Sequence, residues 1–356
     1  SGCAGWSYAD VLPYFKRMES YSHGGDAFRG AEGPLNVYRP SPKDPLALAF
    51  IKSGEQAGYP LTDDICGYRQ EGFGSLDRSV HAGERWSTAR AYLDPARERP
   101  NLTVVTKAQV QRLVIEGRRA TGVVYKDRRG KITTVQARRE VILSAGAVGS
   151  PQLLMLSGIG PGRHLNALDI PVLLDRPAVG SNLQDHIDYV SSWESESRVP
   201  IGNSREGTMR MLSAMVEHRR KRTGVMTTPY AEAGGFWTVG SDAPCPDVQW
   251  HFVPAMLEDH GREKVNGHGI SLHACVLRPE SRGTVRLTSQ DAADSPAIDP
   301  NFLDDERDIA VLREGVRLSH RIAEAPPLSD YGLTDRFPIN PADDAALDAL
   351  DRICQN

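Results

Sequence analysis

The fold of this chain is decided by the stretch SAGAVGSPQLLMLSGIG, residues 144–160. The residues just before it, 140–143, contain a continuous apolar run, which is typical of a strand buried on both faces of a sheet. Gly146 and Gly149 follow at once, and glycine lets the backbone turn tightly and approach a neighbour closely. The pattern therefore predicts a buried strand that ends in a glycine turn.

A helix is expected to begin where this turn ends. Ser150 suits the position that caps a helix, and Pro151 suits its first residue, where a missing N–H costs nothing. Three leucines continue the helix until Gly158 ends it. A strand, a glycine turn and a helix N-terminus together form an element that can face an anion or a cofactor. An ordinary strand-to-helix connection would have the same pattern.

The rest of the chain mixes helical and strand-like segments. Apolar residues at helical spacing predict helices, over 7–21, 45–57, 205–222 and 306–323. Short apolar runs between turn residues predict strands, over 102–105, 110–115, 121–125, 132–135, 247–252, 270–277 and 283–287. Residues 62–83 are polar, glycine-rich and irregular, which is typical of a lid or a binding loop.

Composition and charge exclude several classes of protein. The 42 basic and 46 acidic residues are well mixed and give a net charge of −4, so the sequence has no electrostatic footprint for nucleic acid. No apolar run reaches the ~18 residues of a transmembrane helix. The five cysteines form no C-x-x-C pair, which favours reduced thiols in a cytoplasmic protein over a disulfide framework. The length of 356 residues suggests two domains.

The stretch 146–160 also resembles a motif of a known family. Its order Gly-Ala-x-x-Ser-Pro-x-Leu-Leu-x-x-Ser-Gly-Ile-Gly is similar, at every defined position, to the second signature motif of the glucose–methanol–choline (GMC) oxidoreductases. Further stretches similar to this family occur along the whole chain, at 5–15, 87–93, 99–102, 179–186, 281–287 and 298–302. The pattern most resembles the bacterial choline, alkanol and polyethylene-glycol dehydrogenases of the family.

The resemblance implies a fold of the class α/β plus α+β. It implies an FAD-binding, Rossmann-like domain whose middle part is 91–190, and a substrate-binding domain of antiparallel sheet backed by helices at 191–356. Residues 1–90 would mix FAD-domain and lid segments. Family members open with a β-α-β unit that carries G-x-G-x-x-G and cradles the FAD pyrophosphate. No such motif occurs here, so we expect this internal fragment to lack that first unit.

The resemblance also implies a reaction. An FAD-dependent member of the family oxidises a primary alcohol, a CH–OH donor, to an aldehyde by hydride transfer to flavin N5. The electron acceptor could be a quinone or oxygen, and the substrate an alkanol, a polyether alcohol or choline. A family lyase or decarboxylase and an inactive truncated remnant are further alternatives. The family's catalytic histidine lies in an H-P-x-G-T motif that is absent here, so we expect it beyond Asn356 and expect the chain alone to be inactive.

Four residues are implied as contacts of the cofactor. In the family, the backbone of the residue at Val110 touches the adenine ring, and Ala145, Gly146 and Ala147 lie near the adenosine end of FAD. For Val110 the alternative is a plain sheet residue, and for the other three an ordinary turn. No residue of the chain is expected to bind a metal ion.

Two residues are implied as contacts of the substrate. Glu194 follows His186 by eight residues, and in choline-oxidising relatives a glutamate at this offset faces the cationic head group. Trp193 precedes it, and a carboxylate with an aromatic ring would suit a quaternary ammonium ion. His251, on an expected strand, would line the floor of the pocket. The alternatives are a solvent-facing glutamate and a histidine satisfied within the core.

Two further patterns could indicate other functions: a set of four histidines and a run of basic residues. His251, His260, His268 and His273 are nine, eight and five residues apart, which is not a compact pattern of metal ligands. The basic run 218–222 could touch anionic lipid or nucleic acid, although basic residues also favour the C-terminus of a helix. We therefore expect a cytoplasmic protein of bacterial type, binding a small alcohol and no nucleic acid. Peripheral contact with a membrane stays open.

Overall fold

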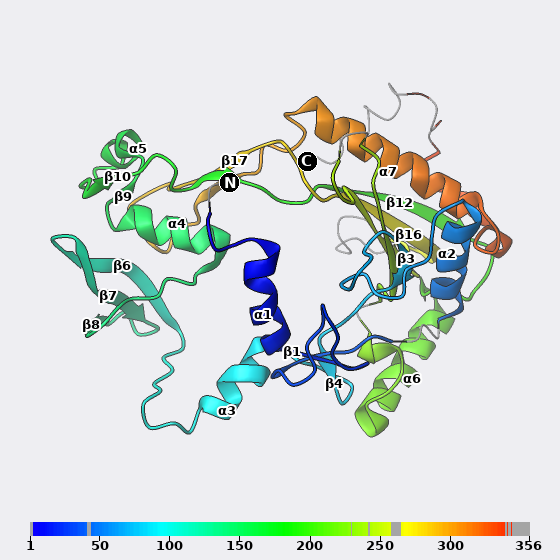
Figure 1. The fold of residues 1–356 in the computed structure, drawn as a ribbon, viewed down its shortest axis with the longest axis horizontal. Helices are drawn as coiled ribbons and strands as arrows, with labels where there is room; N and C mark the ends of the chain where they lie inside the picture. Colours follow the sequence, from blue (N-terminus) through cyan, green and yellow to red (C-terminus); the bar gives the residue numbers. More distant parts are fainter. Residues whose placement is uncertain are drawn as a thin grey trace. The chain divides into compact units, whose positions relative to one another are not determined.

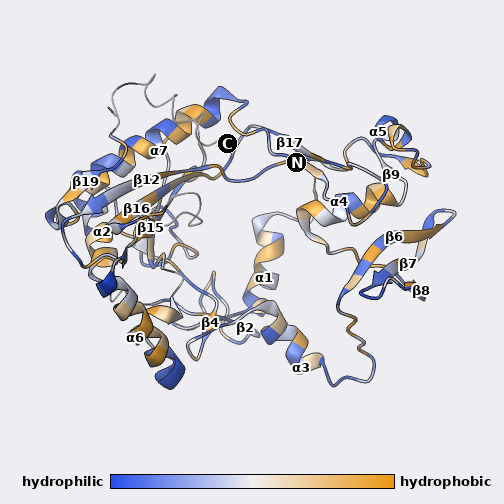
Figure 2. Cartoon of the chain, turned by 180° about the vertical axis from the view of Figure 1, so that it is seen from behind, coloured by the Kyte–Doolittle hydropathy of each residue, from blue (hydrophilic) through white to orange (hydrophobic). Residues whose placement is uncertain are grey.

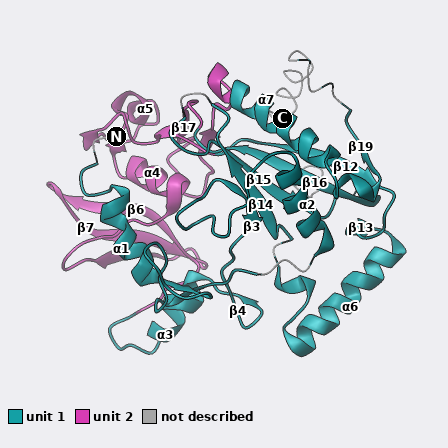
Figure 3. Cartoon of the chain, turned by 45° about the vertical axis from the view of Figure 1, so that its right-hand side comes forward, with its two compact units in different colours: residues 1–102, 186–278, 309–356 teal, residues 103–185, 279–308 magenta. Residues whose placement is uncertain are grey.

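The computed structural model describes residues 3–40, 44–228, 230–240, 243–257, 265–338, 340 and 343 (Figure 1). The chain divides into two compact units, which Figure 3 colours separately. Unit 1 comprises residues 1–102, 186–278 and 309–356, and unit 2 comprises residues 103–185 and 279–308. Each unit is thus assembled from segments that are far apart in the sequence.

An antiparallel sheet is the centre of unit 1. Its strands follow the order β19-β12-β16-β15-β14-β3, and each is antiparallel to its neighbour. They are β3 (Gly72–Ser75), β12 (Asp188–Ser195), β14 (Ala233–Trp237), β15 (Val248–Val253), β16 (Gly267–Val276) and β19 (Leu333–Asp335). A short strand, β13 (Gly202–Asn203), pairs with β16 off this path. The antiparallel sheet expected on the substrate side is confirmed.

Helices α2 (Pro45–Gln56) and α7 (Glu306–Glu324) pack on this sheet (Figure 1). Phe50 of α2 stacks on Phe252 of β15, with the ring centroids 5.0 Å apart. The indole N–H of Trp250 donates a hydrogen bond of 3.0 Å to the hydroxyl of Ser319 on α7. Burying each of these aromatic side chains stabilises the fold by roughly 1.5–3 kcal/mol. The expected helices behind the sheet are therefore confirmed as well.

The side chains of β15 alternate between the two faces of the sheet. Trp250 and Phe252 are fully buried against the helices. His251 lies between them in sequence and is less buried, because successive residues of a strand point to opposite faces. The face of the sheet that carries His251 is therefore the face that the helices do not cover.

The other elements of unit 1 are short, apart from two helices. They are α1 (Tyr8–Met18), β1 (Glu19–Tyr21), β2 (Leu35–Val37), β4 (Val80–His81), β5 (Glu84–Arg85), the π-helix η1 (Ala89–Leu93), α3 (Asp94–Ala96), α6 (Arg205–Lys221), and the 3₁₀ turns η2 (Val225–Thr227) and η4 (Ser329–Tyr331). Ser7 and Asp10 form a capping box that starts α1. The first expected helix ends at Met18, since the next residues pair as β1 with β2.

Unit 2 contains two three-stranded sheets and two helices. One sheet has the order β6-β7-β8, formed by Ala108–Glu116, Arg119–Asp127 and Ile132–Gln136. The other has the order β11-β17-β18, formed by Ser181–Leu183, Gly283–Arg286 and Ala297–Asp299. The remaining elements are α4 (Gly146–Leu156), α5 (Gly162–Ala167) and the parallel pair β9 (Ile159–Gly160) and β10 (Leu174–Asp175). Met155, Leu165, Ile170 and Leu287 form a small core.

Several expected elements are wrong. Residues 102–105 and 140–143 form no strand, and Ile142 is 78% exposed rather than buried. A strand needs a neighbour for its backbone hydrogen bonds, and neither segment has one among the described residues. Conversely, the segment 62–83 was expected to be irregular, yet it contributes β3 to the sheet of unit 1. Strands β12 and β14 were not predicted.

The helix within residues 144–160 begins earlier than expected. Helix α4 starts at Gly146, so Ser150 and Pro151 lie inside it rather than at its N-terminus. The hydroxyl of Ser150 instead accepts a hydrogen bond of 3.1 Å from the amide of Ala145, one residue before the helix. Pro151 is the sixth residue of the helix, so it withholds one backbone N–H from the helical hydrogen bonds.

The compact units divide the chain differently from the expected domains. Residues 279–308, expected in the substrate-binding domain, belong to unit 2 together with 103–185. Compact units need not coincide with cofactor and substrate domains, so the boundaries 91–190 and 191–356 stay a prediction. In the part of the chain that the structure describes, no helix is both long and apolar enough to cross a membrane.

Candidate active site

The uncovered face of the sheet in unit 1 carries polar side chains from three adjacent strands. Strand pairing sets Asp188 opposite Cys275, Ser192 opposite Ser271, and His251 opposite His273. Residues paired in this way point to the same face of a sheet. We call this set the polar face: Asp188, Ser192, Glu194, His251, Ser271 and His273.

Two residues of the polar face form a charged hydrogen bond. The Nδ1 atom of His273 lies 2.7 Å from Oδ2 of Asp188, so the ring N–H donates to the carboxylate. The other ring nitrogen, Nε2, is buried and has no hydrogen-bond partner among the residues that the structure describes. A carboxylate bound to one nitrogen fixes the tautomer and the orientation of an imidazole. Asp188 thus leaves Nε2 as the nitrogen that can meet another group.

His251 lies directly across from His273 in the sheet. Burial lowers the pKa of His251, neighbouring His273 lowers it further, and the Asp188 carboxylate opposes the shift. An imidazole with a pKa below its usual 6.5 is neutral at pH 7. The structure therefore gathers a neutral histidine, a second histidine and a carboxylate on adjacent strands.

Glu194 lies at the far end of the same face. It pairs with Gly269, four residues before His273 on β16, whereas His251 lies on the strand at the other side of β16. With about 3.3 Å per residue and 4.8 Å per strand, Glu194 and His251 are roughly 16 Å apart. The structure does not bring the two expected substrate residues together.

The expected pairing of Glu194 with Trp193 is wrong. Trp193 is 4% exposed and points toward the helices, where its ring meets the His320 ring of α7 edge-on at 5.4 Å. Glu194 is exposed on the opposite face. Adjacent residues of a strand cannot line one pocket, because their side chains alternate. A carboxylate-and-ring pair for a quaternary ammonium ion does not form from these two residues.

The expected cofactor residues all lie in unit 2. Val110 is a partly buried residue of β6, next to a bulge. Helix α4 packs against this strand, and the Ser157 hydroxyl at the end of α4 accepts a hydrogen bond of 2.8 Å from the amide of Leu113. Strand β6, which carries Val110, and helix α4, which follows Ala145, therefore pack against each other.

The start of α4 leaves room for a ligand. Gly146 has a φ of +79°, and a Cβ built on it would meet no atom within 4 Å. Ala145 and Ala147 are exposed, and no side chain caps the helix, so its first backbone N–H groups are available to an anion. An open, uncapped helix start is compatible with the expected contact near the adenosine end of FAD, which stays a prediction.

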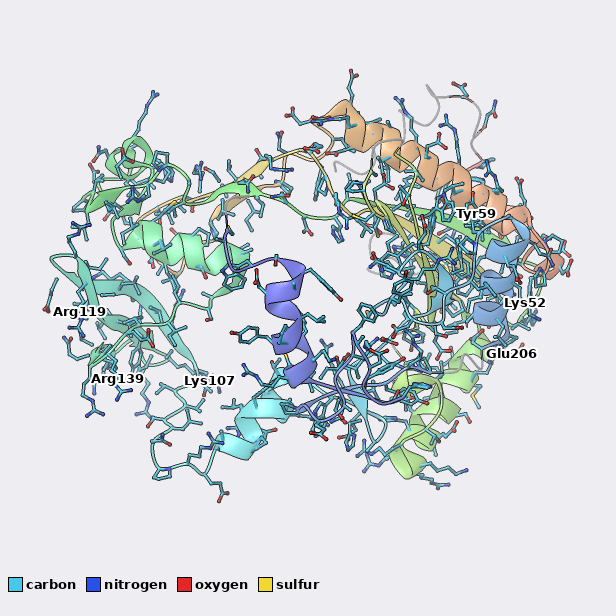
Figure 4. All side chains as sticks on the ribbon, in the orientation of Figure 1. Lys52, Tyr59, Lys107, Arg119, Arg139 and Glu206 are labelled. Carbon is cyan, nitrogen blue, oxygen red and sulfur yellow. The ribbon has the colours of Figure 1, made fainter. Side chains whose placement is uncertain are left out.

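A shallow, open depression lies at the beginning of β6. It has a volume of about 510 Å³, and its lining comprises Lys107, Ala108, Gln109, Lys126, Asp127 and Arg128. Figure 4 labels Lys107 where the chain enters this strand. Val110 directly follows Gln109, and three of the six lining residues are basic, which suits an anionic group.

A cluster of possible metal ligands is committed to ion pairs. Asp64, Cys66 and Asp77 offer ligand atoms within 4.8 Å of one another. Arg29 Nη1 lies 2.8 Å from both carboxylates, and Arg39 also pairs with both, at 2.8 Å and 2.7 Å. Two buried guanidinium groups already neutralise this cluster and would repel a cation. We assign it to structural ion pairing.

The described histidines of the four considered above as metal ligands do not gather at one site. Both ring nitrogens of His268 are bonded, Nδ1 to the Pro200 carbonyl at 2.8 Å and Nε2 to the Ser204 hydroxyl at 3.0 Å. His260 lies outside the described residues. His251 and His273 are the two that share a face.

Sequence analysis missed the pairing of Asp188 with His273. The two residues are 85 positions apart, and no local motif joins them. Alternating polar residues within the expected strand 270–277 were the one signal that could have singled out His273.

The antiparallel sheet with its helices in unit 1, and the strands and helices of unit 2, give the chain a mixed α/β fold in two units. Models of the family described as GMC oxidoreductase match residues 1–188 with the N-terminal part and residues 279–355 with the C-terminal part. The chain belongs to the GMC oxidoreductase family, and FAD is the cofactor of this class.

Similar proteins agree with this assignment. An oxygen-dependent choline dehydrogenase of Paraburkholderia phymatum is 41% identical over 99% of this chain and 62% of its own length. The mitochondrial choline dehydrogenase of Mus musculus is 41% identical over 93% of the chain and 55% of its own length. The crystal structure of pyridoxine 4-oxidase from Mesorbium loti, 28% identical, matches with a TM-score of 0.84 over 100% of this chain and 66% of that one. The chain thus spans about three-fifths of the length of these curated relatives.

Proposed function

We propose that this chain is part of an FAD-dependent dehydrogenase that oxidises the primary alcohol choline to its aldehyde. Relatives that are named choline dehydrogenases match nearly the whole chain at 41% identity. Within this proposal, unit 2 contributes to the FAD site, and the sheet of unit 1 contributes to the substrate site. When bound, FAD accepts a hydride at N5 from the carbinol carbon of the alcohol.

The observation that carries the proposal is the histidine pair beside a carboxylate on the polar face. His251 has a lowered pKa and is neutral, so it can accept or donate a hydrogen bond at the substrate hydroxyl without repelling a cation. Asp188, bound to His273, adds a negative charge close by. A neutral imidazole next to a carboxylate favours a cationic alcohol over an uncharged one.

Glu194 has a separate role in this proposal. Its carboxylate is exposed at the end of the polar face, too far from His251 to hold the same small molecule. We assign it to long-range attraction of the cationic substrate toward the face. Its contribution should therefore weaken as the ionic strength rises.

On the cofactor side, Val110, Ala145, Gly146 and Ala147 are assigned to the adenosine end of FAD. Their backbone, rather than their side chains, would make the contacts, which explains why small residues suffice there. No described residue is assigned as the base that removes the hydroxyl proton.

The experiment compares substrates with the flavin-loaded, full-length enzyme of which this chain is proposed to be a part. Choline, an uncharged primary alkanol and a polyether alcohol are oxidised in parallel, with oxygen uptake and quinone reduction measured separately. We expect the highest kcat/KM for choline, and a fall for His251→Ala of about tenfold or more. A preference for the uncharged alcohols, or an unchanged His251→Ala enzyme, would contradict the proposal.

A further inference from the structure

Helix α6 carries four apolar side chains that are at least half exposed in the described part of the chain. Met209 is 66% exposed, Leu212 51%, Met215 53% and Val216 50%. The one buried residue of the helix is Ala214. Scattered single apolar residues are ordinary on a surface, but a group of four on one helix indicates a contact surface.

Three of these residues form a continuous stripe. Met209, Leu212 and Val216 are three and four positions apart, so they lie along one side of the helix. Ala214 points to the opposite side, toward the rest of unit 1. Figure 2 shows hydrophobic segments along α6 and a strongly hydrophilic C-terminal end.

The helix is fixed at both ends. The Ser204 hydroxyl accepts a hydrogen bond of 3.0 Å from the amide of Gly207 and also contacts His268 at 3.0 Å. At the other end, Arg222 pairs with Glu84 at 2.8 Å. Because both ends are held, the apolar stripe is a fixed feature of unit 1 rather than the result of a frayed helix.

The charge around the stripe is strongly positive. Residues 205–222 contain six basic and two acidic residues, a net charge of +4 in a chain whose total is −4. Arg219 and Arg220 lie one turn beyond the stripe, on either side of it, and are exposed. Glu206, labelled in Figure 4, lies in the first turn, away from this basic end. Such long side chains can extend past an apolar stripe to reach charged groups.

We propose that α6 docks flat on the surface of an anionic phospholipid membrane. Its stripe would enter the boundary between head groups and acyl chains, and its basic residues would meet lipid phosphates. A second copy of the chain is a poorer occupant, since a symmetric pairing through this face would oppose two surfaces of charge +4. The proposal is independent of the choline reaction.

The test is flotation of the purified protein with lipid vesicles. Vesicles of phosphatidylcholine alone are compared with vesicles containing about one-third phosphatidylglycerol. The protein should float with the anionic vesicles and dissociate as salt is added. The combined change R219Q, R220Q and K221Q should weaken binding about fivefold per charge removed, roughly a hundredfold in all. The combined change M209Q, L212Q and V216Q should abolish binding at every salt concentration.

Matched controls lie elsewhere in the chain. R118Q with R129Q removes two exposed basic residues, and I132T with V135T removes two exposed apolar ones; neither pair should alter flotation. Equal binding to neutral vesicles, or anionic binding that survives both α6 variants, would overturn the proposal. So would a wild-type dimer that becomes a monomer in the M209Q, L212Q and V216Q variant without any flotation, because the face would then join two copies. Circular dichroism checks that each variant is folded.

Discussion

The Nδ1 atom of His273 lies 2.7 Å from the Oδ2 atom of Asp188, although the two residues are 85 positions apart in the chain. The pair occupies the one face of the central sheet that the helices leave uncovered, and His251 is the direct neighbour of His273. Strand order alone creates this arrangement, since β12, β16 and β15 are adjacent in space. The relationship suggests that Asp188 acts as a positioning residue.

Asp188→Asn tests that role. The amide keeps the shape but loses the charge, so we expect kcat/KM for choline to fall about tenfold, in line with the ~1.5–3 kcal/mol of a charge-assisted hydrogen bond. The pKa of His251 should also fall further, because the carboxylate opposes its lowering. Steady-state kinetics and an NMR titration of the ring protons measure the two effects. Asp94→Asn, on the surface, should change neither.

The stability of the protein should depend on pH through His251. Its pKa is lowered in the folded protein, chiefly by burial, and is about 6.5 when unfolded. Below pH 6.5 the unfolded chain therefore binds a proton that the folded protein does not, and stability is lost as the pH falls through that range. Urea unfolding at about pH 7.5 and 5.5 should show a smaller loss for His251→Gln than for wild type. An identical loss in both would refute the assignment.

Gly146 and Gly117 form a matched pair for testing the cofactor element. Both have positive φ, +79° and +60°, and a Cβ at either would meet no atom within 4 Å. Valine at each should cost a similar ~1–2 kcal/mol of backbone strain. Gly146→Val alone should weaken FAD binding as well, measured by quenching of flavin fluorescence. Equal FAD affinity in the two variants would count against a cofactor contact at Gly146.

The ion-pair network around Arg29 should stabilise unit 1 strongly. Arg29 is 2% exposed and pairs with Glu19, Asp64 and Asp77 at 2.7–2.8 Å. Arg29→Met removes the guanidinium partner of Glu19 and leaves Asp64 and Asp77 to share Arg39 alone. This buried excess of negative charge should lower the free energy of unfolding by about 3–5 kcal/mol. Arg97→Met, which breaks an exposed pair with Asp94, should change it by less than about 1 kcal/mol. Urea titration compares the two. Equal shifts would mean that the buried network contributes no more than a surface pair.

The sequence by itself determined the family and most of the helices. The motif at 146–160 is defined by the order of its residues, which the sequence contains in full. Helices such as α2 and α6 form through contacts between residues three and four positions apart, so the sequence also predicts them. Strands with a close partner in the sequence, such as β6, β7 and β8, were predictable for the same reason.

Tertiary structure decided what depends on distant partners. The apolar run at 140–143 looked like a buried strand, but a strand forms only when another one supplies its hydrogen bonds. Trp193 and Glu194 are adjacent in sequence yet point to opposite faces, while Asp188 and His273 are remote in sequence yet bonded. Strand register fixes which side chains meet, and register is set by pairing across the sheet rather than by the order of residues along the chain.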